Sequence, residues 1–521
     1  MDRETVIRLS REAHIDLDLT ETILRRLDAA EHTVAPAGKY TIPEGSGAII
    51  DADEGLTVKR TQLEENPLVT TGLLQLLRKI PGVTTCGDDM RFTREALNAA
   101  GLHLVGTISY GMLNGGSATS YIDEKKNSAF YPPLIDIIGD TFRSVGENIR
   151  NRPKALTPAY LNQDGSPGYT FLEMKLRGLL LLMLEASVAT GQTPNIPIFE
   201  MRSTHTELPL SEAYSAAADS PLLTDLCRYL SYDISEAIDY RTQPMVAAFS
   251  SGKSGGSRTL FTYTDSSGSP RLLPLPGGHG QNFTVLQEIY RGLYRRGIQF
   301  SYLVNIDNLG NIPDPHSIAI TVLSGADAAF EFSRKTPMDV KGGILALNDD
   351  KSYVCADIGV AISRDEVEAA EQAGHPLLFN CATGLFNLSY LTENLDAIIA
   401  DLPIRINEQD KDIGRYAHPE QVTWEVLQYI PKPLILSVAK ENRFLAAKLL
   451  SEMIVTSTAS RVIPQLRRQR PEYRAFCDQS LTLQQGLFRL MEHTYGMKEI
   501  HGRWVPRTLE ELLKMFNDRH R

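Results

Sequence analysis

Hydrophobic positions follow two different periodicities along this chain and divide it into three parts. Before residue 101 and after residue 457, apolar side chains recur every three or four residues, as in ETILRRLDAAEH and LTLQQGLFRLMEH, which predicts amphipathic helices. Between these parts, short apolar runs alternate with helical segments, which is typical of a mostly parallel sheet covered by helices. We therefore predict an α/β protein with a helical N-terminal region (1–100), a central domain (101–457) and a helical C-terminal region (458–521).

Six apolar runs in the central part are candidate strands: LHLVGTISYGML, IPIFEM, MVAAFS, FSYLVNI, SYVCADIGVAI and PLLFNCATGLF. Two Gly/Ser-rich stretches between Gly252 and Pro270 flank RTLFTYT, which predicts a mobile loop followed by a hairpin. A helix over TREALNAAG is expected to end at Gly101. The most apolar run, Leu176 to Met183, is too short to span a bilayer and predicts a buried helix.

Composition narrows the class of protein. The chain has 521 residues, of which 42% are hydrophobic and 22% charged, as in ordinary globular proteins. Its formal net charge of −11 argues against a nucleic-acid partner. The five cysteines are scattered without a CxxC pair, which predicts reduced thiols rather than a disulfide framework or a cysteine zinc site. MDRETVIRLSREAH has no apolar signal core, so we expect a cytoplasmic protein without a membrane partner.

The stretch from Pro274 to Gly310 carries the clearest chemical signal. The glycines of PLPGGHG surround His279 and precede a helical pattern that Gly297 is placed to end. FSYLVNI then reads as a buried strand, and Asp307 follows its end. A glycine loop that opens a helix presents free backbone N–H groups to an anion, and an acid at the carboxyl end of a strand lies where α/β sheets bind ligands. Together they predict a site for a phosphorylated ligand and a divalent metal.

A second glycine loop follows the first strand of the central part, in LNGGSATSYIDEKKN. Gly115 and Gly116 allow the backbone to approach a ligand closely, and Lys125 and Lys126 are candidates to reach phosphate oxygens. The GKS/T ending of a Walker motif is missing, so the loop alone is also typical of a turn beside a charged surface.

Taken in chain order, these motifs resemble those of the UTP-dependent sugar-1-phosphate uridylyltransferases of the UDP-glucose pyrophosphorylase type. The resemblance runs from about Leu102 to Val455, and IPIFEMRSTHT resembles the family's PLxxMNSFNT. The family motif LNGGLGT…PK is matched by Leu113, Asn114, Gly115 and Gly116, with Lys126 as its lysine if one position is deleted, and PGHG is matched by Gly278, His279 and Gly280. The motif SNxDNLG is matched by Asn305, Asp307, Asn308, Leu309 and Gly310, and DVKGG is present unaltered and contains Lys341 and Gly342. The motif FNTNN…NL is matched by Phe379, Asn380, Asn387 and Leu388, and RFLPVK by Arg443, Phe444, Leu445 and Lys448.

The resemblance implies a Rossmann-like nucleotide-diphospho-sugar transferase core that binds UTP and a sugar 1-phosphate. The sugar phosphate would attack the α-phosphorus of UTP and release pyrophosphate, a reaction that needs alignment and charge neutralisation more than covalent help. The implied catalytic residues are Lys126 and Lys448, and Asp307 is the implied Mg²⁺ ligand. The implied substrate-binding residues are Leu113, Asn114, Gly115, Gly116, Gly278, His279, Asn305, Lys341, Gly342 and Asn380.

Departures from the family pattern leave alternatives open. Ser117, Ala118 and Thr119 stand where the family has LGT, and Ala382 and Thr383 replace asparagines. Besides a glucose 1-phosphate enzyme, which the GGHG and NIDNLG spellings favour, the chain is compatible with an enzyme for N-acetylglucosamine 1-phosphate or another sugar. It is also compatible with a catalytically silent paralogue.

Two further points stay open in the sequence. Lys125 competes with Lys126 for the lysine role, and Asp314 competes with Asp307 for the metal, although its flanking prolines suggest a turn away from the strand. The family's C-terminal β-helix has no counterpart in the helical pattern after residue 457. We therefore expect a monomer or a small homo-oligomer.

Overall fold

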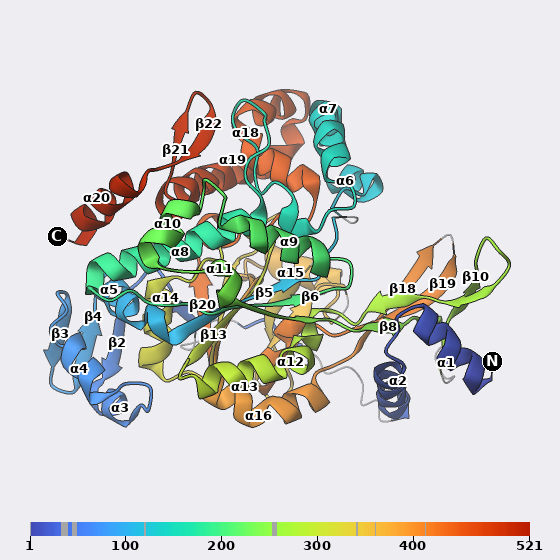
Figure 1. Cartoon of the computed structure of the whole chain (residues 1–521), viewed down its shortest axis with the longest axis horizontal. Coiled ribbons are helices and arrows are strands. Elements are labelled where there is room, and N and C mark those ends of the chain that lie inside the picture. Colours follow the sequence, from blue (N-terminus) through green and yellow to red (C-terminus); the bar gives the residue numbers. More distant parts are fainter. Residues whose placement is uncertain are drawn as a thin grey trace.

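The computed structural model of the chain centres on one large sheet with helices on both of its faces (Figure 1). It describes residues 2–32, 40–43, 49–118, 121–252, 258–339, 342–359, 361–411 and 413–520. The predicted α/β fold with a mostly parallel sheet is confirmed.

Within the described residues, ten strands form the central sheet. Its main path runs in the order β1 (Ile49–Asp51), β20 (Pro433–Val438), β14 (Ala328–Arg334), β17 (Leu378–Asn387), β13 (Phe300–Asn305), β5 (Ile108–Asn114), β6 (Ile198–Arg202) and β7 (Ile238–Thr242). Neighbours on this path are parallel, except that β17 runs antiparallel to β14 and β13. A hairpin of β15 (Gly343–Leu347) and β16 (Tyr353–Asp357) is attached to β17. The loops after β5, β6 and β13 therefore leave the sheet at the same edge.

The side chains of β13 alternate between two cores. Tyr302 and Val304 belong to the core on one face of the sheet, and Leu303 belongs to the core on the other. Both faces are covered, which is why the strand reads as one apolar run in the sequence.

Three long helices pack on one face of the sheet and a second set packs on the other (Figure 1). The first set is α5 (Arg94–Leu104), α8 (Phe171–Thr190) and α14 (Pro315–Ser324), and the second is α12 (Asn282–Val285), α13 (Gln287–Arg295) and α16 (Leu388–Asp401). The predicted buried helix over Leu176 to Met183 is confirmed within α8. None of the helices in the described part of the chain has the length and apolar character that crossing a membrane requires.

Five of the six candidate strands contribute to the central sheet, and one does not. MVAAFS forms β8 (Met245–Ala247) and β9 (Phe249–Ser250), which pair with β12 (Pro274–Pro276) and β19 (Gly414–Glu420) outside the sheet. In LHLVGTISYGML, only the second half is strand, because its first residues complete α5.

Gly101 does not end its helix, contrary to the prediction. It lies inside α5, and a Cβ atom at this position would be 1.8 Å from the carbonyl oxygen of Pro315 at the start of α14. The glycine therefore permits the close approach of α5 to α14, which a pattern within one helix cannot reveal.

Small β elements accompany the helices at both ends of the chain. The N-terminal elements are α1 (Arg3–Glu12), α2 (Leu17–His32), β2 (Leu56–Lys59), α3 (Arg60–Glu65), α4 (Thr71–Leu77), β3 (Val83–Cys86) and β4 (Asp89–Phe92). The C-terminal elements are α18 (Leu450–Gln469), α19 (Arg474–Arg489), β21 (Met497–Ile500), β22 (Arg503–Pro506) and α20 (Leu509–His520). One core cluster contains Leu97, Tyr302 and Tyr495, so it draws on all three predicted regions. Residues 458–520, all described, form helices and one hairpin rather than a β-helix.

The predicted hairpin after the Gly/Ser-rich stretch is confirmed as β10 (Thr262–Thr264) paired with β11 (Pro270–Leu272). The stretch itself, residues 253–257, lies outside the described residues. Figure 1 shows β10, β18 and β19 extending from the sheet beside α1 and α2. The remaining elements are α6 (Glu124–Phe130), α7 (Pro132–Ile149), α9 (Glu207–Ala217), α10 (Thr224–Leu230), α11 (Ile234–Ala237), α15 (Arg364–Gln372), β18 (Arg405–Lys411) and α17 (Lys440–Arg443).

Candidate active site

Two loops lie side by side at the carboxyl edge of the sheet. One is the glycine loop after β5, and the other is the loop after β13 that contains Asp307 (residues 306–312), which we call the acidic loop. The two strands are parallel neighbours, and their register pairs Asn305 with Leu113. Gly115 and Gly116 follow one strand end, and Asp307 follows the other. The sheet therefore brings together two motifs that are almost 200 residues apart in the sequence.

The glycine loop forms backbone hydrogen bonds with residues 152–154, which follow helices α6 and α7 in the sequence. The backbone N–H of Lys154 donates to Gly116 O (3.1 Å), and that of Ala118 donates to Arg152 O (3.1 Å). Helices α6 and α7 lie in the sequence between these bonded segments, and α7 packs against α18 (Figure 1). The pair Pro153–Lys154 thus continues the glycine loop in space, as the Pro-Lys pair of LNGGLGT…PK continues it in the family's sequences.

Ala118, which stands where the family has a glycine, is not strained. Its side chain is fully buried, and it is not among the described residues with a positive φ. The backbone there is open to any L-residue. Thr119 and Ser120 of the same loop lie outside the described residues.

Lys154 and Asp307 form an ion pair at the centre of this edge. Lys154 Nζ lies 2.7 Å from Asp307 Oδ2, and both side chains are largely buried, with 12% and 16% exposed. The ammonium group also lies 5.0 Å from the centroid of the Tyr121 ring. Burial raises the pKa of Asp307, but the positive charges of Lys154, Lys448 and Lys175 outweigh that effect and hold the pKa below its ordinary value. The carboxylate is therefore charged at neutral pH.

Lys175 contacts the loop that carries Asp307 from the buried side. It lies on α8, is completely buried, and donates hydrogen bonds to Asn308 O and to Asn311 Oδ1. Burial lowers its pKa well below the ordinary value. The lysine therefore holds the backbone immediately after Asp307, at a depth that a substrate does not reach.

The segment that carries Lys448 runs along the acidic loop. Backbone hydrogen bonds join Leu309 N to Leu445 O (3.2 Å) and Ala447 N to Asp307 O (3.1 Å). Gly310 is essential to this approach, because a Cβ atom there would lie 2.4 Å from the backbone of Arg443. Lys448 itself is exposed, and its charge acts on the pKa values of both Asp307 and His279.

His279 faces the same cluster from the opposite glycine turn. Gly278 has φ +82°, and a Cβ atom there or at Gly280 would collide with the backbone of Gln421. The backbone N–H of Thr423 donates to His279 Nδ1 (3.1 Å), so the ring hydrogen of the neutral imidazole is on Nε2. Burial, and to a smaller extent the charge of Lys448, lower the pKa of His279 to about 4. The ring is neutral at physiological pH and offers a hydrogen-bond donor.

This pKa predicts how stability depends on pH. Because the folded protein binds the proton of His279 more weakly than the unfolded chain, whose histidine pKa is about 6.5, stability is lost as the pH falls from about 6.5 to 4. The loss from this residue is at most about 3 kcal/mol. In urea unfolding at a series of pH values, His279→Gln is expected to show a flatter profile over this range. Parallel profiles for the two proteins would contradict the assignment.

Several residues predicted to bind substrate have partners within the protein. Asn114 is buried and donates through Nδ2 to Glu200 Oε1 (2.9 Å), and Leu113 is part of the hydrophobic core. Asn380 is also largely buried, and its Oδ1 accepts from the N–H of Ala382, which has a positive φ of 52°. That conformation suits asparagine better than alanine, in line with the asparagine that the family has there.

The other predicted residues are placed as follows. Lys126 is exposed in the first turn of α6, where its backbone N–H donates to Asp123 Oδ1 (2.9 Å). Gly342 has φ +133° and packs on Phe379. Lys341 lies outside the described residues, and Asn305 is half-buried at the end of β13.

The two candidate aspartates differ in their hydrogen-bond partners. Asp314 caps this helix, since its Oδ2 accepts hydrogen bonds from the N–H (3.1 Å) and the hydroxyl (2.8 Å) of Ser317. The carboxylate is committed to the helix end, whereas that of Asp307 faces the lysines.

The predicted helix after His279 is present with a break. A short 3₁₀ turn (His279–Gln281) leads into α12, and α13 follows after Leu286. Gly297, at φ +85°, follows its end as expected.

Lys154 and Lys175 were not identified as candidate site residues from the sequence. The letters PK at 153–154 were a usable signal for Lys154, but the excursion through α6 and α7 separates them from the glycine loop. Lys175 carried no signal, because its apolar surroundings suggested only a buried helix.

Comparisons with known proteins show similarity in part of the sequence and in the fold. Residues 259–488 match the family model described as UTP–glucose-1-phosphate uridylyltransferase. The UTP–glucose-1-phosphate uridylyltransferase 2 of Dictyostelium discoideum is 25% identical over 186 residues, 35% of this chain and 36% of that protein. The enzyme of Solanum tuberosum is also 25% identical over 186 residues, 35% of this chain and 38% of that protein. The chain thus matches little more than a third of the length of these curated relatives.

Two solved structures share the fold over most of their length. A mutant UDP-glucose pyrophosphorylase from Leishmania major, in complex with UDP-glucose, superimposes with a TM-score of 0.51 and 16% identity, covering 87% of this chain and 78% of that one. The UDP-N-acetylglucosamine pyrophosphorylase from Trypanosoma brucei, in complex with an inhibitor, gives 0.52 and 13%, covering 81% and 80%.

The chain therefore shares the fold of these two pyrophosphorylases, and its charged cluster lies at the carboxyl edge of the sheet, where open α/β sheets bind ligands. Residues 259–488 are similar in sequence to the UTP–glucose-1-phosphate uridylyltransferases.

Proposed function

We propose that this protein is a uridylyltransferase that converts UTP and a sugar 1-phosphate, glucose 1-phosphate in the first place, into a UDP-sugar and pyrophosphate. The observation that carries the proposal is the cluster of Asp307, Lys154 and Lys448 beside the glycine loop. It supplies positive charge and one carboxylate at the edge of a nucleotide-binding sheet. Transfer of a nucleotidyl group between phosphates needs this arrangement, since alignment and charge neutralisation supply most of the catalysis.

The carboxylate fits a magnesium ion. Mg²⁺ in phosphate chemistry usually takes one or two carboxylates and completes its shell with substrate phosphates and water. Asp307 is such a single carboxylate, charged and partly open to solvent. The described residues contain no group of three or more His, Cys, Asp or Glu side chains that could hold a metal ion by themselves. Bound there, Mg²⁺ would neutralise charge on the phosphate oxygens.

The surrounding side chains would divide the remaining work. Gly115 and Gly116 let the backbone approach the uridine nucleotide, and the neutral Nε2–H of His279 would donate to a phosphate oxygen. Lys154 takes the role that the sequence assigned to Lys126, since it continues the glycine loop and contacts Asp307. Lys448, on the opposite side of the cluster, would bind phosphate oxygens as charge develops on the leaving pyrophosphate.

A pyrophosphate-release assay tests the proposal. The protein would be given Mg²⁺ and UTP, with glucose 1-phosphate, N-acetylglucosamine 1-phosphate or other sugar 1-phosphates in separate reactions. The expected result is turnover that depends on UTP and is fastest with glucose 1-phosphate. Faster turnover with N-acetylglucosamine 1-phosphate would move the protein to the second candidate, which the fold shared with the Trypanosoma brucei enzyme also suits.

The silent-paralogue alternative gives a different pattern of results. Such a protein would be stabilised against heat by UTP or a UDP-sugar and would release no pyrophosphate with any sugar 1-phosphate. Binding raises stability by RT ln(1 + [L]/Kd), so UTP is expected to raise Tm more than ATP or GTP at the same concentration. Equal shifts with all three nucleotides would argue against a uridine site.

A further inference from the structure

The loop that carries Asp307 is held through its backbone carbonyls. Side chains from four separate parts of the chain, besides the loop's own Asn311, donate to these oxygens. The bonds are Asn311 Nδ2 to Asn305 O (3.0 Å), Lys175 Nζ to Asn308 O, Tyr495 OH to Leu309 O (2.6 Å), Tyr110 OH to Asn311 O (3.3 Å) and Arg443 to Ile312 O (2.8 Å). The geometry of the acidic loop is thus set by groups that a substrate does not touch.

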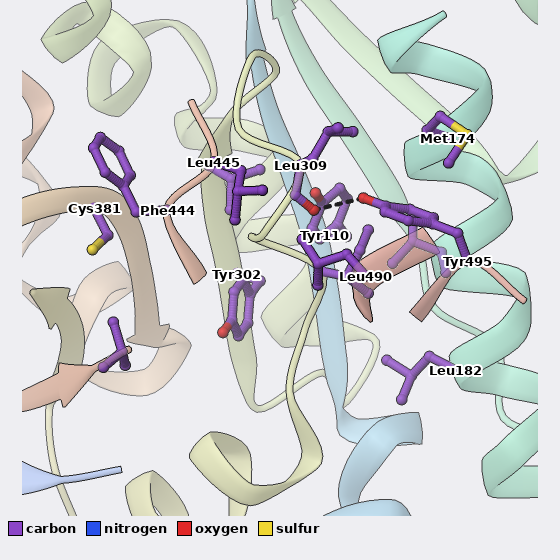
Figure 2. Close-up of a cluster of buried hydrophobic side chains, with 14 of the residues drawn as sticks. Tyr110, Met174, Leu182, Tyr302, Leu309, Cys381, Phe444, Leu445, Leu490 and Tyr495 are labelled. Atoms are coloured by element: carbon purple, nitrogen blue, oxygen red, sulfur yellow. Dashed lines mark hydrogen bonds between the residues drawn. The ribbon is translucent and has the colours of Figure 1, made fainter. Parts of the chain in front are cut away.

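One of these donors comes from the C-terminal region. Tyr495 directly follows a π-helical turn, Leu490–Thr494, at the end of α19. Figure 2 shows its hydroxyl pointing to the carbonyl of Leu309, with Leu490, Leu182 and Met174 around it. Its ring is fully buried, so water cannot easily replace the hydroxyl as a donor.

Tyr495 is itself fixed from its backbone. Arg177 of α8 donates through Nε to Tyr495 O (2.6 Å) and through a terminal nitrogen to Gly496 O (3.2 Å). The next turn back on α8 presents Met174 and Lys175 toward the same loop. Tyr495 therefore connects the C-terminal region to Leu309, two positions after Asp307, and we call this buried connection the Tyr495 strut. Interruptions of a helix by a π turn often occur where a side chain must be aimed at a functional site.

We propose that Tyr495 is a positioning residue for Asp307, so that the C-terminal helical region forms part of the catalytic unit. The hydroxyl holds the Leu309 carbonyl, and this fixes the direction in which the Asp307 carboxylate leaves the strand end. The inference rests on the proposed function for its catalytic consequence, although the strut itself is a property of the fold.

Tyr495→Phe tests the strut, because it removes the hydroxyl and keeps the ring. Tyr232→Phe is the matched control. The Tyr232 hydroxyl also donates to a buried backbone carbonyl, that of Ile196 (2.6 Å). Ile196 precedes strand β6, at the end of the strand opposite to the candidate active site. Both variants lose one bond of the same kind. Only Tyr495→Phe is expected to increase amide hydrogen exchange in residues 305–312, by about tenfold, since the loop loses a fixed point.

The kinetic expectation follows from misplacement of the carboxylate. Tyr495→Phe should lower kcat about tenfold and raise the Mg²⁺ concentration for half-maximal turnover, with KM for UTP nearly unchanged. Tyr232→Phe should leave all three unchanged. Equal exchange in residues 305–312 for wild type and Tyr495→Phe would overturn the proposal.

The two ideas can fail separately. If wild type releases no pyrophosphate with any sugar 1-phosphate, the proposed function fails, but the exchange measurement still decides the strut. If Tyr495→Phe does not fold, wild type in low urea serves instead. There, residues 305–312 and 490–497 are expected to lose protection in one step, and separate opening of the two segments would contradict the coupling.

Discussion

Asp307→Asn is expected to remain folded and to lose turnover by about 10²–10³-fold, with part of the activity recovered only at much higher Mg²⁺ concentration. The substitution keeps the shape of the side chain but removes the negative charge that the metal needs. Asparagine offers one neutral oxygen, which binds Mg²⁺ far more weakly than a carboxylate does. The measurement is kcat as a function of Mg²⁺ concentration, with urea unfolding to show that the variant is folded.

The same substitution also removes the negative charge opposite Lys154. Lys154, Lys175 and Lys448 all act on the Asp307 carboxylate, so their positive charges are no longer offset. A loss of about 1–3 kcal/mol in unfolding free energy is expected, because a largely buried ammonium group exchanges a charged acceptor for a neutral one.

Asp314→Asn is the matched control. This aspartate lies seven positions further on and caps α14, a role that asparagine also fills, so the substitution should change stability by about 1 kcal/mol or less and leave the Mg²⁺ dependence unchanged. If Asp307→Asn behaved like Asp314→Asn, with near-normal turnover at ordinary Mg²⁺, the metal role of Asp307 would be excluded.

Lys154→Met is expected to lower kcat/KM by about 10²-fold, while Lys126→Ala changes it by less than about threefold. Lys154 Nζ is at the centre of the cluster, 2.7 Å from the Asp307 carboxylate and against the Tyr121 ring. Lys126 is exposed on α6. Methionine keeps an unbranched apolar stem of four heavy atoms and removes the terminal ammonium group with its charge and donors.

The ranking of the lysine variants discriminates between two alignments of the glycine loop. A larger effect of Lys126→Ala, or of Lys125→Ala, would return the phosphate-binding role to the DEKKN run and leave Lys154 as a structural partner of Asp307. A double substitution of Lys154 and Asp307 adds a second check. Because the two groups touch, their effects are expected to combine less than additively.

The local part of the site could be predicted from the sequence. Strand β13, the acid at its end, the glycine turn around His279 and the buried helix α8 all follow from short patterns whose causes are local: burial on both faces, backbone freedom at glycine and hydrophobic periodicity. The side of the sheet was predictable as well, since parallel strands present their carboxyl ends at one edge.

Contacts across long sequence separations could not be read in this way. Lys126 was assigned by aligning the DEKKN run with the family's glycine loop after deletion of one position, and that run lies close to Gly116 in the sequence. Lys154 lies next to the glycine loop only because the chain runs through helices α6 and α7 and then comes back to the site. Gly101 was interpreted as a helix end, and its actual role depends on Pro315, more than 200 residues away.

The sequence by itself determined the fold class, the two glycine turns and the candidate metal ligand, because each depends on residues that are neighbours along the chain. Only the tertiary structure decided which lysine meets Asp307, which carboxylate caps a helix and which tyrosines hold the acidic loop. The physical reason is that an ion pair or a buried hydrogen bond depends on distance in space, and the packing of α8, α18 and the π turn before Tyr495 sets those distances.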